Sequence, residues 1–480
     1  MRARPAVDSP VGSHTFGHVS APDRSWTIAP TLLWFGGILV VGLLVVDGTL
    51  EALADRLTSP REMAPAAPGF APAPIVVAEA ARDEDERPGV PAVGGTGDRA
   101  RGSALEDVCL DGTPAACTRW AMDSFYRAVA AEAGNKLGRA LRVSWYGDSV
   151  VATDAIPARL RSRLQGELGD GGPGFVYVVA PHRFCLHEGI SRTHGGTWAT
   201  HAISTQQIAD GLYGAGGAAA ETEGGRATIK LVTGKATHVE VHYLTQPRGG
   251  SVQVKADGTE VIVAETRGDA KAGAVAKASI VAGAKQFQLQ TSGRVRVFGV
   301  DLENASGAVV DNFGIVSVNV KSFANFNAAH FATELEHRNS DLIMLMLGAN
   351  EAQWLSPGDR DTKAYQANYE KVLAPIRKAR PDATCLVVSP TDQAEARDGG
   401  YPSRPVMPAL IDAQRKAAHA SGCAFFSTYD WMGGKGSAAK WFRKGYVGSD
   451  FQHLSRKGAN KMADAVFDAL MAGYRRYGTH

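Results

Sequence analysis

Cysteine is scarce in this sequence, with five in 480 residues, and no Cys-x-x-Cys or Cys/His spacing of a structural zinc site occurs. Neither positive nor negative charge is in large excess, because 51 Lys and Arg residues balance 49 Asp and Glu residues. Nucleic acid is therefore not an expected partner, since binding the phosphate backbone needs a basic surface. Low-complexity composition is absent as well, and the 44% hydrophobic content predicts packed domains.

One long apolar run is present near the N-terminus, where residues 28–46 carry no charge. At 1.5 Å per residue, a helix of this length crosses a hydrocarbon core of about 30 Å. A cleavable signal peptide and a buried helix are the alternatives, but no clear cleavage site follows directly. Arg2, Arg4 and Arg24 precede the run, so we expect residues 1–27 to form a cytoplasmic arm, residues 28–46 a transmembrane signal-anchor, and the rest to lie outside the cytoplasm.

The next segment has the composition of a linker. Seven prolines and the charged run 82–87 fall between residues 60 and 104, with no apolar periodicity. We therefore expect residues 47–104 to tether the folded part to the membrane.

The cysteines fall into two different settings. Cys109 and Cys117 are eight apart in a polar stretch that is able to close a small disulfide loop. Cys385 and Cys423 lie in apolar, strand-like runs, where we expect reduced, buried thiols.

Apolar strands alternate with amphipathic helices in two separated parts of the chain. This pattern predicts an α/β fold, with a parallel sheet covered by helices on both faces. The strand-like runs are residues 141–149, 341–352, 384–390 and 423–430, and the helical ones include residues 361–380, 405–420 and 455–474, the last with Ser455 as N-cap.

Between these two parts of the chain, apolar residues recur at every second position. Short alternating segments, separated by glycine-containing turns, fill residues 226–303 and predict an inserted antiparallel β-sandwich. The expected domains are residues 105–200 as the first part of the α/β domain, 201–305 as the insert and 306–480 as the second part. The insert either has a structural role or binds a polymer.

Two polar motifs follow expected strands, Gly-Asp-Ser at 147–149 and Gly-Ala-Asn-Glu at 348–351, and a third, Asp-Phe-Gln-His at 450–453, lies in the loop before the last expected helix. Loops at the carboxyl ends of parallel strands converge at one edge of the sheet. Each motif alone is more often a turn or a cap. Together they supply what ester hydrolysis needs, namely a hydroxyl nucleophile, a base, an orienting acid and an oxyanion donor. The candidates for these roles are Ser149, His453, Asp450 and Asn350.

The set of motifs resembles the SGNH (GDSL-type) hydrolase superfamily. The resemblance implies a three-layer fold, no metal, no cofactor, Ser149 as nucleophile, His453 as base and Asp450 as its orienting acid. It also implies an oxyanion hole made by the Ser149 N–H, the Asn350 side chain and a backbone N–H in the second motif. There Ser317 occupies the place of the usual glycine, and Gly314 is the alternative donor.

Within the superfamily, three features resemble the peptidoglycan O-acetylesterase branch. They are the stretch 169–178 (GDGGPGFVYV), the third motif in the form GANEA and the inserted β-domain. The resemblance implies a membrane-anchored serine esterase, periplasmic or at the cell surface, that hydrolyses O-acetyl groups on an acetylated cell-wall polysaccharide such as peptidoglycan. An O-acyltransferase of the same fold and a non-catalytic wall-binding protein are the alternatives.

Other residues were weighed for function. Four loop histidines have spacings that favour no metal site, a glycine-rich stretch at 433–437 lacks P-loop spacing, and Glu351 is expected to cap or pair locally. Four aromatic residues are candidates for stacking on sugar rings. The histidines are His182, His187, His194 and His201, and the aromatic residues are Trp198, Tyr401, Trp431 and Trp441.

Overall fold

The structure is a computed structural model that describes residues 105–397 and 399–477. The predicted cytoplasmic arm (1–27), membrane span (28–46) and linker (47–104) lie outside these residues. Within the described part of the chain, no helix combines the length and the apolar character that crossing a bilayer requires.

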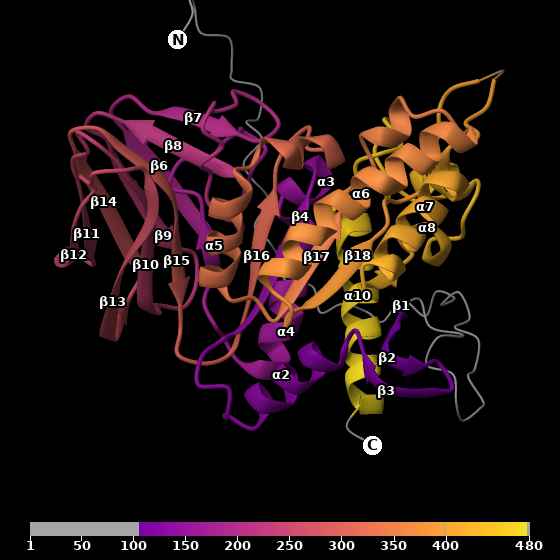
Figure 1. The fold of residues 1–480 in the computed structure, drawn as a ribbon, viewed down its shortest axis with the longest axis horizontal. Coiled ribbons are helices and arrows are strands. Elements are labelled where there is room, and N and C mark those ends of the chain that lie inside the picture. The colour runs from indigo at the N-terminus through magenta and orange to yellow at the C-terminus, as the bar shows by residue number, and fades with distance from the viewer. Residues whose placement is uncertain (1–104, 398, 478–480) are drawn as a thin grey trace, which may run out of the picture. The chain divides into compact units, whose positions relative to one another are not determined.

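The predicted parallel sheet is confirmed and is the centre of the larger domain (Figure 1). Its strand order is β1-β19-β18-β17-β4-β16, and β1 alone runs antiparallel at the edge. β16, β4 and β17 are neighbours, so the loops after their carboxyl ends lie side by side. The strands are β1 (Leu105–Glu106), β4 (Leu141–Gly147), β16 (Ala308–Gly314), β17 (Leu342–Met346), β18 (Thr384–Val388) and β19 (Ala424–Phe426).

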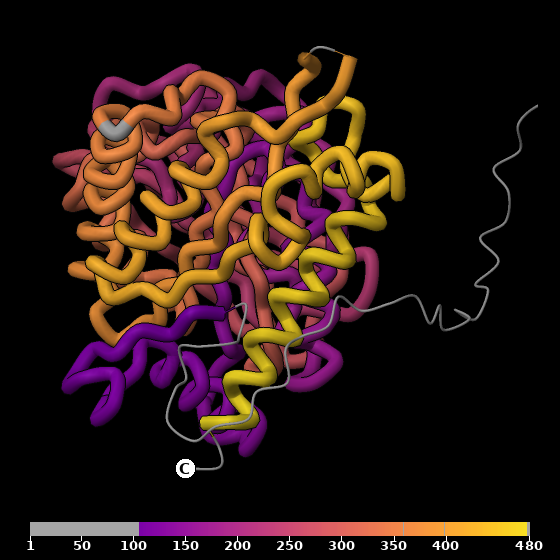
Figure 2. The backbone as a smooth tube through the Cα atoms, turned by 90° about the vertical axis from the view of Figure 1, so that its right-hand side faces the viewer, coloured from indigo at the N-terminus to yellow at the C-terminus, as the bar shows by residue number. Residues whose placement is uncertain are grey.

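Helices cover both faces of this sheet. α5, α6 and α7 pack on one face, and α2, α4 and α10 on the other, where α10 (yellow) runs the length of the domain in Figure 2. The predicted N-cap is confirmed, because the Ser455 hydroxyl accepts a hydrogen bond from Gly458 N–H at 3.2 Å. The helices are α2 (Asp123–Ala133), α3 (Ser149–Ala152), α4 (Ala155–Leu168), α5 (Ala328–Arg338), α6 (Asp359–Ala379), α7 (Met407–Ala420), α8 (Thr428–Trp431), α9 (Ser437–Arg443) and α10 (Arg456–Tyr477), with 3-10 turns η1 (Val320–Asn325) and η2 (Glu351–Gln353).

The inserted domain is a sandwich of two antiparallel sheets around an apolar core. It begins before the expected boundary at residue 201, because β5 and β6 already belong to it. These strands are short or polar, and so show no clear apolar period. One sheet contains β13 (Ala272–Ala284), β10 (Ala236–Thr245), β15 (Val295–Glu303), β8 (Ala218–Thr222), β7 (Ala199–Ala202) and β5 (Gly174–Val176), and the other contains β12 (Thr259–Glu265), β11 (Ser251–Ala256), β14 (Gln286–Ser292), β9 (Arg226–Leu231) and β6 (Ile190–Gly195).

The sandwich is joined to the α/β domain through β15, all nine residues of which are buried. Arg338 of α5 hydrogen-bonds Asp301 of β15 and, with two bonds of 2.7 Å, Asp311 of β16. Arg142 of β4 pairs with Glu303 at 2.7 Å. Buried charges that are paired across a boundary are costly to separate, so the two domains form one packed unit.

The cysteines differ from expectation at one pair. The predicted Cys109–Cys117 disulfide is confirmed and closes the hairpin of β2 (Cys109–Thr113) and β3 (Ala116–Trp120). The prediction of reduced thiols at Cys385 and Cys423 was wrong, because these residues also form a disulfide. Cys385 lies on β18 and Cys423 directly precedes the neighbouring strand β19, with Cα atoms 4.7 Å apart, a proximity that depends on strand order and not on local composition.

Candidate active site

Ser149 lies where β4 turns sharply into α3. Asp148 is the N-cap of α3, and its carboxylate accepts a hydrogen bond from Val150 N–H at 3.0 Å. Gly147 is required at this turn, because a Cβ there would lie 2.3 Å from the Val151 side chain. The short turn therefore places the Ser149 hydroxyl at the carboxyl edge of the sheet.

The structure brings His453 and Asp450 to this hydroxyl. Ser149 Oγ lies 2.7 Å from His453 Nε2, and His453 Nδ1 lies 2.6 Å from Asp450 Oδ2. Asp450 Oδ1 also accepts hydrogen bonds from the N–H groups of Gln452 and His453, each at 3.0 Å. Burial raises the pKa of Asp450, but these hydrogen bonds outweigh it and hold the pKa below its usual value.

This arrangement has the geometry of a hydroxyl nucleophile, a base and an orienting carboxylate. It is also open to solvent, since the side chains of His453 and Asp450 are 43% and 51% exposed. A substrate much larger than an acetyl group is therefore able to approach the serine.

The expected oxyanion donors lie on the three neighbouring loops. Asn350 follows β17, and its side-chain amide donates to Val318 O at 2.8 Å, which leaves its second N–H available. Within the described residues, no hydrogen-bond acceptor contacts the N–H groups of Ser149 and Ser317. Ser317 is exposed and has φ 65°, the left-handed conformation that favours the glycine expected at this position.

Gly314, the alternative donor, does not fit the role. Its N–H already donates to Asn312 Oδ1 at 2.9 Å. It also packs closely on α3, since a Cβ at this position would lie 2.3 Å from Ala152 N. Gly314 is thus a packing and turn residue, which leaves Ser317 as the candidate on this loop.

Glu351, which was expected to cap or pair locally, is completely buried next to Asn350 in the chain. Its Oε1 accepts a hydrogen bond from Val320 N–H at 2.8 Å, which joins the loop of Asn350 to the loop of Ser317. Burial, together with a smaller contribution from the nearby Asp148 carboxyl, raises the pKa of Glu351 to about 7. The pKa of Asp148 is itself raised to about 6 by burial.

The other predicted candidates lie in separate places. His187 is buried and contacts Pro173 O at 3.1 Å, while His201 contacts Gln206 O at 2.9 Å. His182 accepts from Phe184 N–H, and His194 lies on β6, so the four histidines do not converge.

Of the candidate aromatic residues, only Tyr401 is well placed to meet a ligand. It is 51% exposed and packs 4.7 Å from the ring of Phe451, which lies between Asp450 and His453. Trp441 is buried, and Trp431 packs against it at 5.3 Å. Trp198 is half-buried and packs against Gly225.

Trp354 was not singled out from the sequence, although its place four residues after Asn350 is a usable signal. It is 53% exposed. Its loop is linked to the loop of His453 by a hydrogen bond from Gln353 to Gln452. One exposed aromatic ring, Trp354, therefore lies on the loop of Asn350, and the other, Tyr401, packs against the loop of His453.

Residues 279–461 match the sequence model of the GDSL-like lipase/acylhydrolase family. The matched residues therefore form a domain of the SGNH hydrolase type. The match contains Asn350, Asp450 and His453 and begins after Ser149, which the insert separates from the other motifs. The family assignment makes the protein a serine esterase, as the sequence predicted.

Solved structures share the fold of this SGNH hydrolase. A peptidoglycan O-acetylesterase aligns with a TM-score of 0.64 and 23% identity over 74% of this chain and 96% of its own. A Bacillus subtilis protein aligns less well, with 14% identity and a TM-score of 0.28 over 57% of this chain and 88% of its own. An acetyl xylan esterase aligns with 17% identity and a TM-score of 0.26 over 34% of this chain and 80% of its own. No curated protein matches the chain.

Proposed function

We propose that this SGNH hydrolase removes O-acetyl groups from a cell-envelope polysaccharide, with peptidoglycan as the expected substrate. The observation that carries the proposal is the 2.7 Å contact between Ser149 Oγ and His453 Nε2, with Asp450 on the other ring nitrogen. The likeness of the fold to a peptidoglycan O-acetylesterase supports the choice of substrate.

The proposed reaction begins when His453 Nε2 accepts the hydroxyl proton of Ser149. Ser149 Oγ then attacks the acetyl carbonyl carbon, and the carbonyl oxygen becomes an oxyanion. Asp450 holds the imidazole in the required tautomer and stabilises its positive charge. When the intermediate collapses, the sugar oxygen leaves with the proton from His453, and the acetyl group remains on Ser149.

The oxyanion is stabilised by the N–H groups of Ser149 and Ser317 and by the second amide N–H of Asn350. These donors come from three loops that are held in place before the substrate binds, which is the condition for strong electrostatic stabilisation. In the second half of the reaction, His453 takes a proton from water. The resulting hydroxide attacks the acetyl carbon, and the bond between that carbon and Ser149 Oγ then breaks. His453 returns its proton to Ser149 Oγ, and acetic acid leaves and ionises to acetate.

The proposed glycan site uses the exposed rings of Trp354 and Tyr401. Sugar rings present C–H faces that pack on aromatic side chains, and these two rings flank the loops of Asn350 and His453. Replacing either ring by alanine should lower kcat/KM on acetylated glycan several-fold and leave p-nitrophenyl acetate hydrolysis nearly unchanged. An equal loss on both substrates would place these rings in the fold and not in glycan binding.

The proposed enzyme is anchored by residues 28–46 and acts in the periplasm or at the cell surface. Two disulfides support this location, because disulfides persist in oxidising compartments outside the cytosol. Labelling intact cells with a membrane-impermeant reagent and detecting the modified protein tests the location.

The decisive experiment measures acetate release by the purified full-length chain from acetylated peptidoglycan, with chemically de-acetylated peptidoglycan as the substrate control and the Ser149→Ala variant as the enzyme control. Acetate release only by the unmodified protein supports the esterase. Transfer of acetyl to an added acceptor glycan in preference to water would instead identify an acyltransferase. Binding to peptidoglycan without any acetyl chemistry would identify a non-catalytic wall-binding protein.

A further inference from the structure

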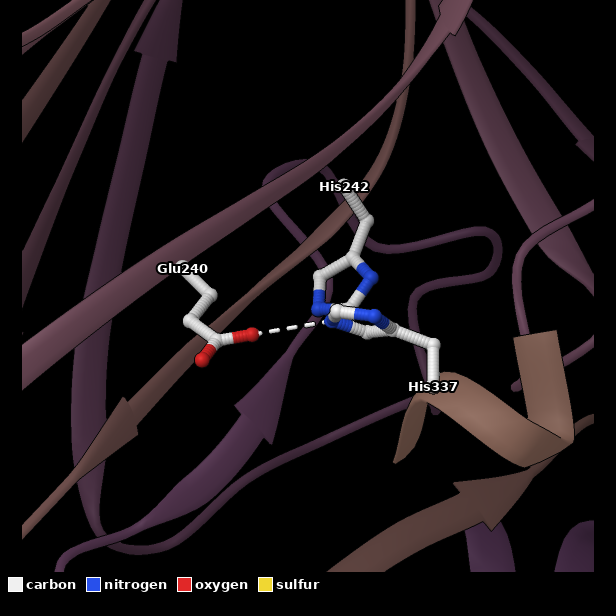
Figure 3. A group of neighbouring side chains, drawn as sticks. All are labelled: Glu240, His242 and His337. Atoms are coloured by element: carbon white, nitrogen blue, oxygen red, sulfur yellow. Dashed lines mark hydrogen bonds and ion pairs between the residues drawn. The ribbon is translucent and has the colours of Figure 1, made fainter. Parts of the chain in front are cut away.

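A second histidine–carboxylate cluster lies away from Ser149, where the sandwich meets α5. Glu240 and His242 come from β10, and His337 comes from the last turn of α5 (Figure 3). One ligand atom from each of the three side chains lies within 4.8 Å of the other two. Three chemistry-bearing groups are thus gathered from segments almost one hundred residues apart.

The β-strand period explains the first two of these positions. Residues two apart on a strand point to the same face, so Glu240 and His242 both face α5. The neighbouring strand β15 places Asp301 opposite Glu240, and its Oδ2 lies 2.9 Å from His242 Nε2. Glu240 Oε2 in turn lies 2.9 Å from His337 Nε2. Each imidazole therefore makes one hydrogen bond with a carboxylate, His242 with Asp301 and His337 with Glu240.

The surroundings carry more negative than positive charge. Five carboxylates lie in or beside the cluster, against one buried arginine, one half-buried arginine and one exposed lysine, which leaves an excess of two negative charges when both imidazoles are neutral. The carboxylates are Glu240, Asp301, Glu303, Asp311 and Glu334, and the cations are Arg142, Arg338 and Lys277, the last as the β13 partner of Glu240.

We infer that Glu240, His242 and His337 bind one divalent transition-metal ion of the zinc class, with water as the fourth ligand. Two imidazoles and one carboxylate suit zinc better than magnesium or calcium, which prefer oxygen ligands alone. This site is not recognisable in the sequence, because its ligands come from non-adjacent elements. The inference is independent of the proposed esterase function.

The spacing of the groups is compatible with such an ion. Zinc bonds of about 2.0 to 2.1 Å in a tetrahedron place two ligand atoms about 3.3 Å apart. The separations here start at 2.9 Å for Glu240 and His337 and stay within 4.8 Å for all three. Glu240 and His337 are partly exposed, at 22% and 35%, so they are free to adjust around the fixed His242. When Nε2 of the neutral His337 binds the ion, the proton that it shared with Glu240 moves to Nδ1 of the same ring.

The inferred role of the ion is structural. It would link β10 of the sandwich to α5, the helix whose Arg338 bridges β15 and β16. A ligand that binds only the folded state raises its stability in proportion to the logarithm of its concentration over Kd. Zinc should therefore raise the melting temperature by several degrees without being needed for acetate release.

The test uses the full-length protein after treatment with a chelator. Zinc chloride is added in a calorimetric titration and in thermal unfolding, with magnesium chloride as a second arm. One zinc per chain is expected, with a rise in Tm and no response to magnesium. Cobalt chloride should give the visible absorption of a tetrahedral site.

Two variants, His337→Ala and Glu240→Gln, should lose both the bound zinc and the rise in Tm. His337 lies near the protein surface, and circular dichroism with cooperative unfolding checks that each variant is folded. The matched control is His194→Ala, which removes an exposed histidine of the same sandwich. His453→Ala excludes binding at the esterase site and should keep the zinc. Zinc bound equally by His337→Ala and the unmodified protein, or no zinc bound by the unmodified protein, would overturn the inference.

Discussion

Two histidine–aspartate pairs in this protein have similar contacts and opposite surroundings. His453 and Asp450 lie 2.6 Å apart with side chains 43% and 51% exposed. His242 and Asp301 lie 2.9 Å apart with both side chains only 4% exposed. The short contact between an imidazole and a carboxylate is therefore not what distinguishes a catalytic pair from a structural one.

The two pairs differ in the groups that they contact. His453 places its second nitrogen on the hydroxyl of Ser149 at an open edge of the sheet. Asp301 instead faces the buried guanidinium of Arg338, which also binds Asp311. The first pair is able to move a proton to a substrate, whereas the second holds two domains together.

The largest effect should come from Ser149→Ala, which removes the nucleophile of the exposed pair. We expect activity on p-nitrophenyl acetate to fall by roughly 10⁴-fold or more, with Tm nearly unchanged, because the half-buried hydroxyl contributes little packing. His453→Ala should be about as damaging, and the double variant no worse, since the two groups act as one unit. Steady-state kinetics and thermal unfolding measure both quantities. Retained acetate release by Ser149→Ala would refute the assignment.

Replacing the aspartate of each pair, Asp450 or Asp301, compares the roles of the two pairs most directly. Asp450→Asn should lower kcat by about 10³-fold and leave Tm unchanged, because the residue is exposed and orients the base. Asp301→Asn should leave kcat within a few-fold but destabilise the fold by about 3 kcal/mol, because it leaves Arg338 short of one buried partner. The two variants are compared by kinetics and by urea unfolding. The same phenotype in both would mean that burial does not separate the roles.

Asn350→Ala comes next, as it removes a donor for the oxyanion beside the exposed pair. We expect kcat to fall by roughly 10²- to 10³-fold with little change in KM, since the contact is made mainly in the transition state. Kinetics over a range of p-nitrophenyl acetate concentrations separates the two parameters. A change in KM alone would make Asn350 a binding residue.

The parts of this site that were predictable from the sequence are local. Asp450 and His453 share one loop, and Ser149 and Asn350 directly follow apolar strands whose parallel order converges their ends. The Cys385–Cys423 disulfide was not predictable, because it depends on which strands are neighbours. The zinc-class cluster and the burial of Glu351 likewise depend on packing between distant segments.

A smaller effect is expected at Glu351, the buried acid that follows Asn350 and binds the Val320 N–H. Its pKa of about 7 in the folded protein exceeds the usual 4.5, so the unfolded chain releases the proton while the folded protein keeps it. Stability should therefore fall as pH rises from 4.5 to 7. Glu351→Gln carries no such proton and should show a shallower fall in urea midpoint over this range. Equal slopes for both proteins would show that Glu351 is not protonated in the fold.

The smallest effect is expected at Ser317, where the argument concerns only the backbone. A backbone φ of 65° is energetically less favourable for serine than for glycine. The proposed oxyanion donor is the backbone N–H of residue 317, which is present with either residue. Ser317→Gly should thus keep activity within a few-fold and change stability by about 1 kcal/mol or less, because relief of strain is offset by a more flexible unfolded chain. Ser317→Ala is the matched control, since it keeps the strain and removes only the hydroxyl. A tenfold loss in Ser317→Ala with p-nitrophenyl acetate would show that the hydroxyl takes part in the reaction, and the role assigned to the N–H would then be wrong.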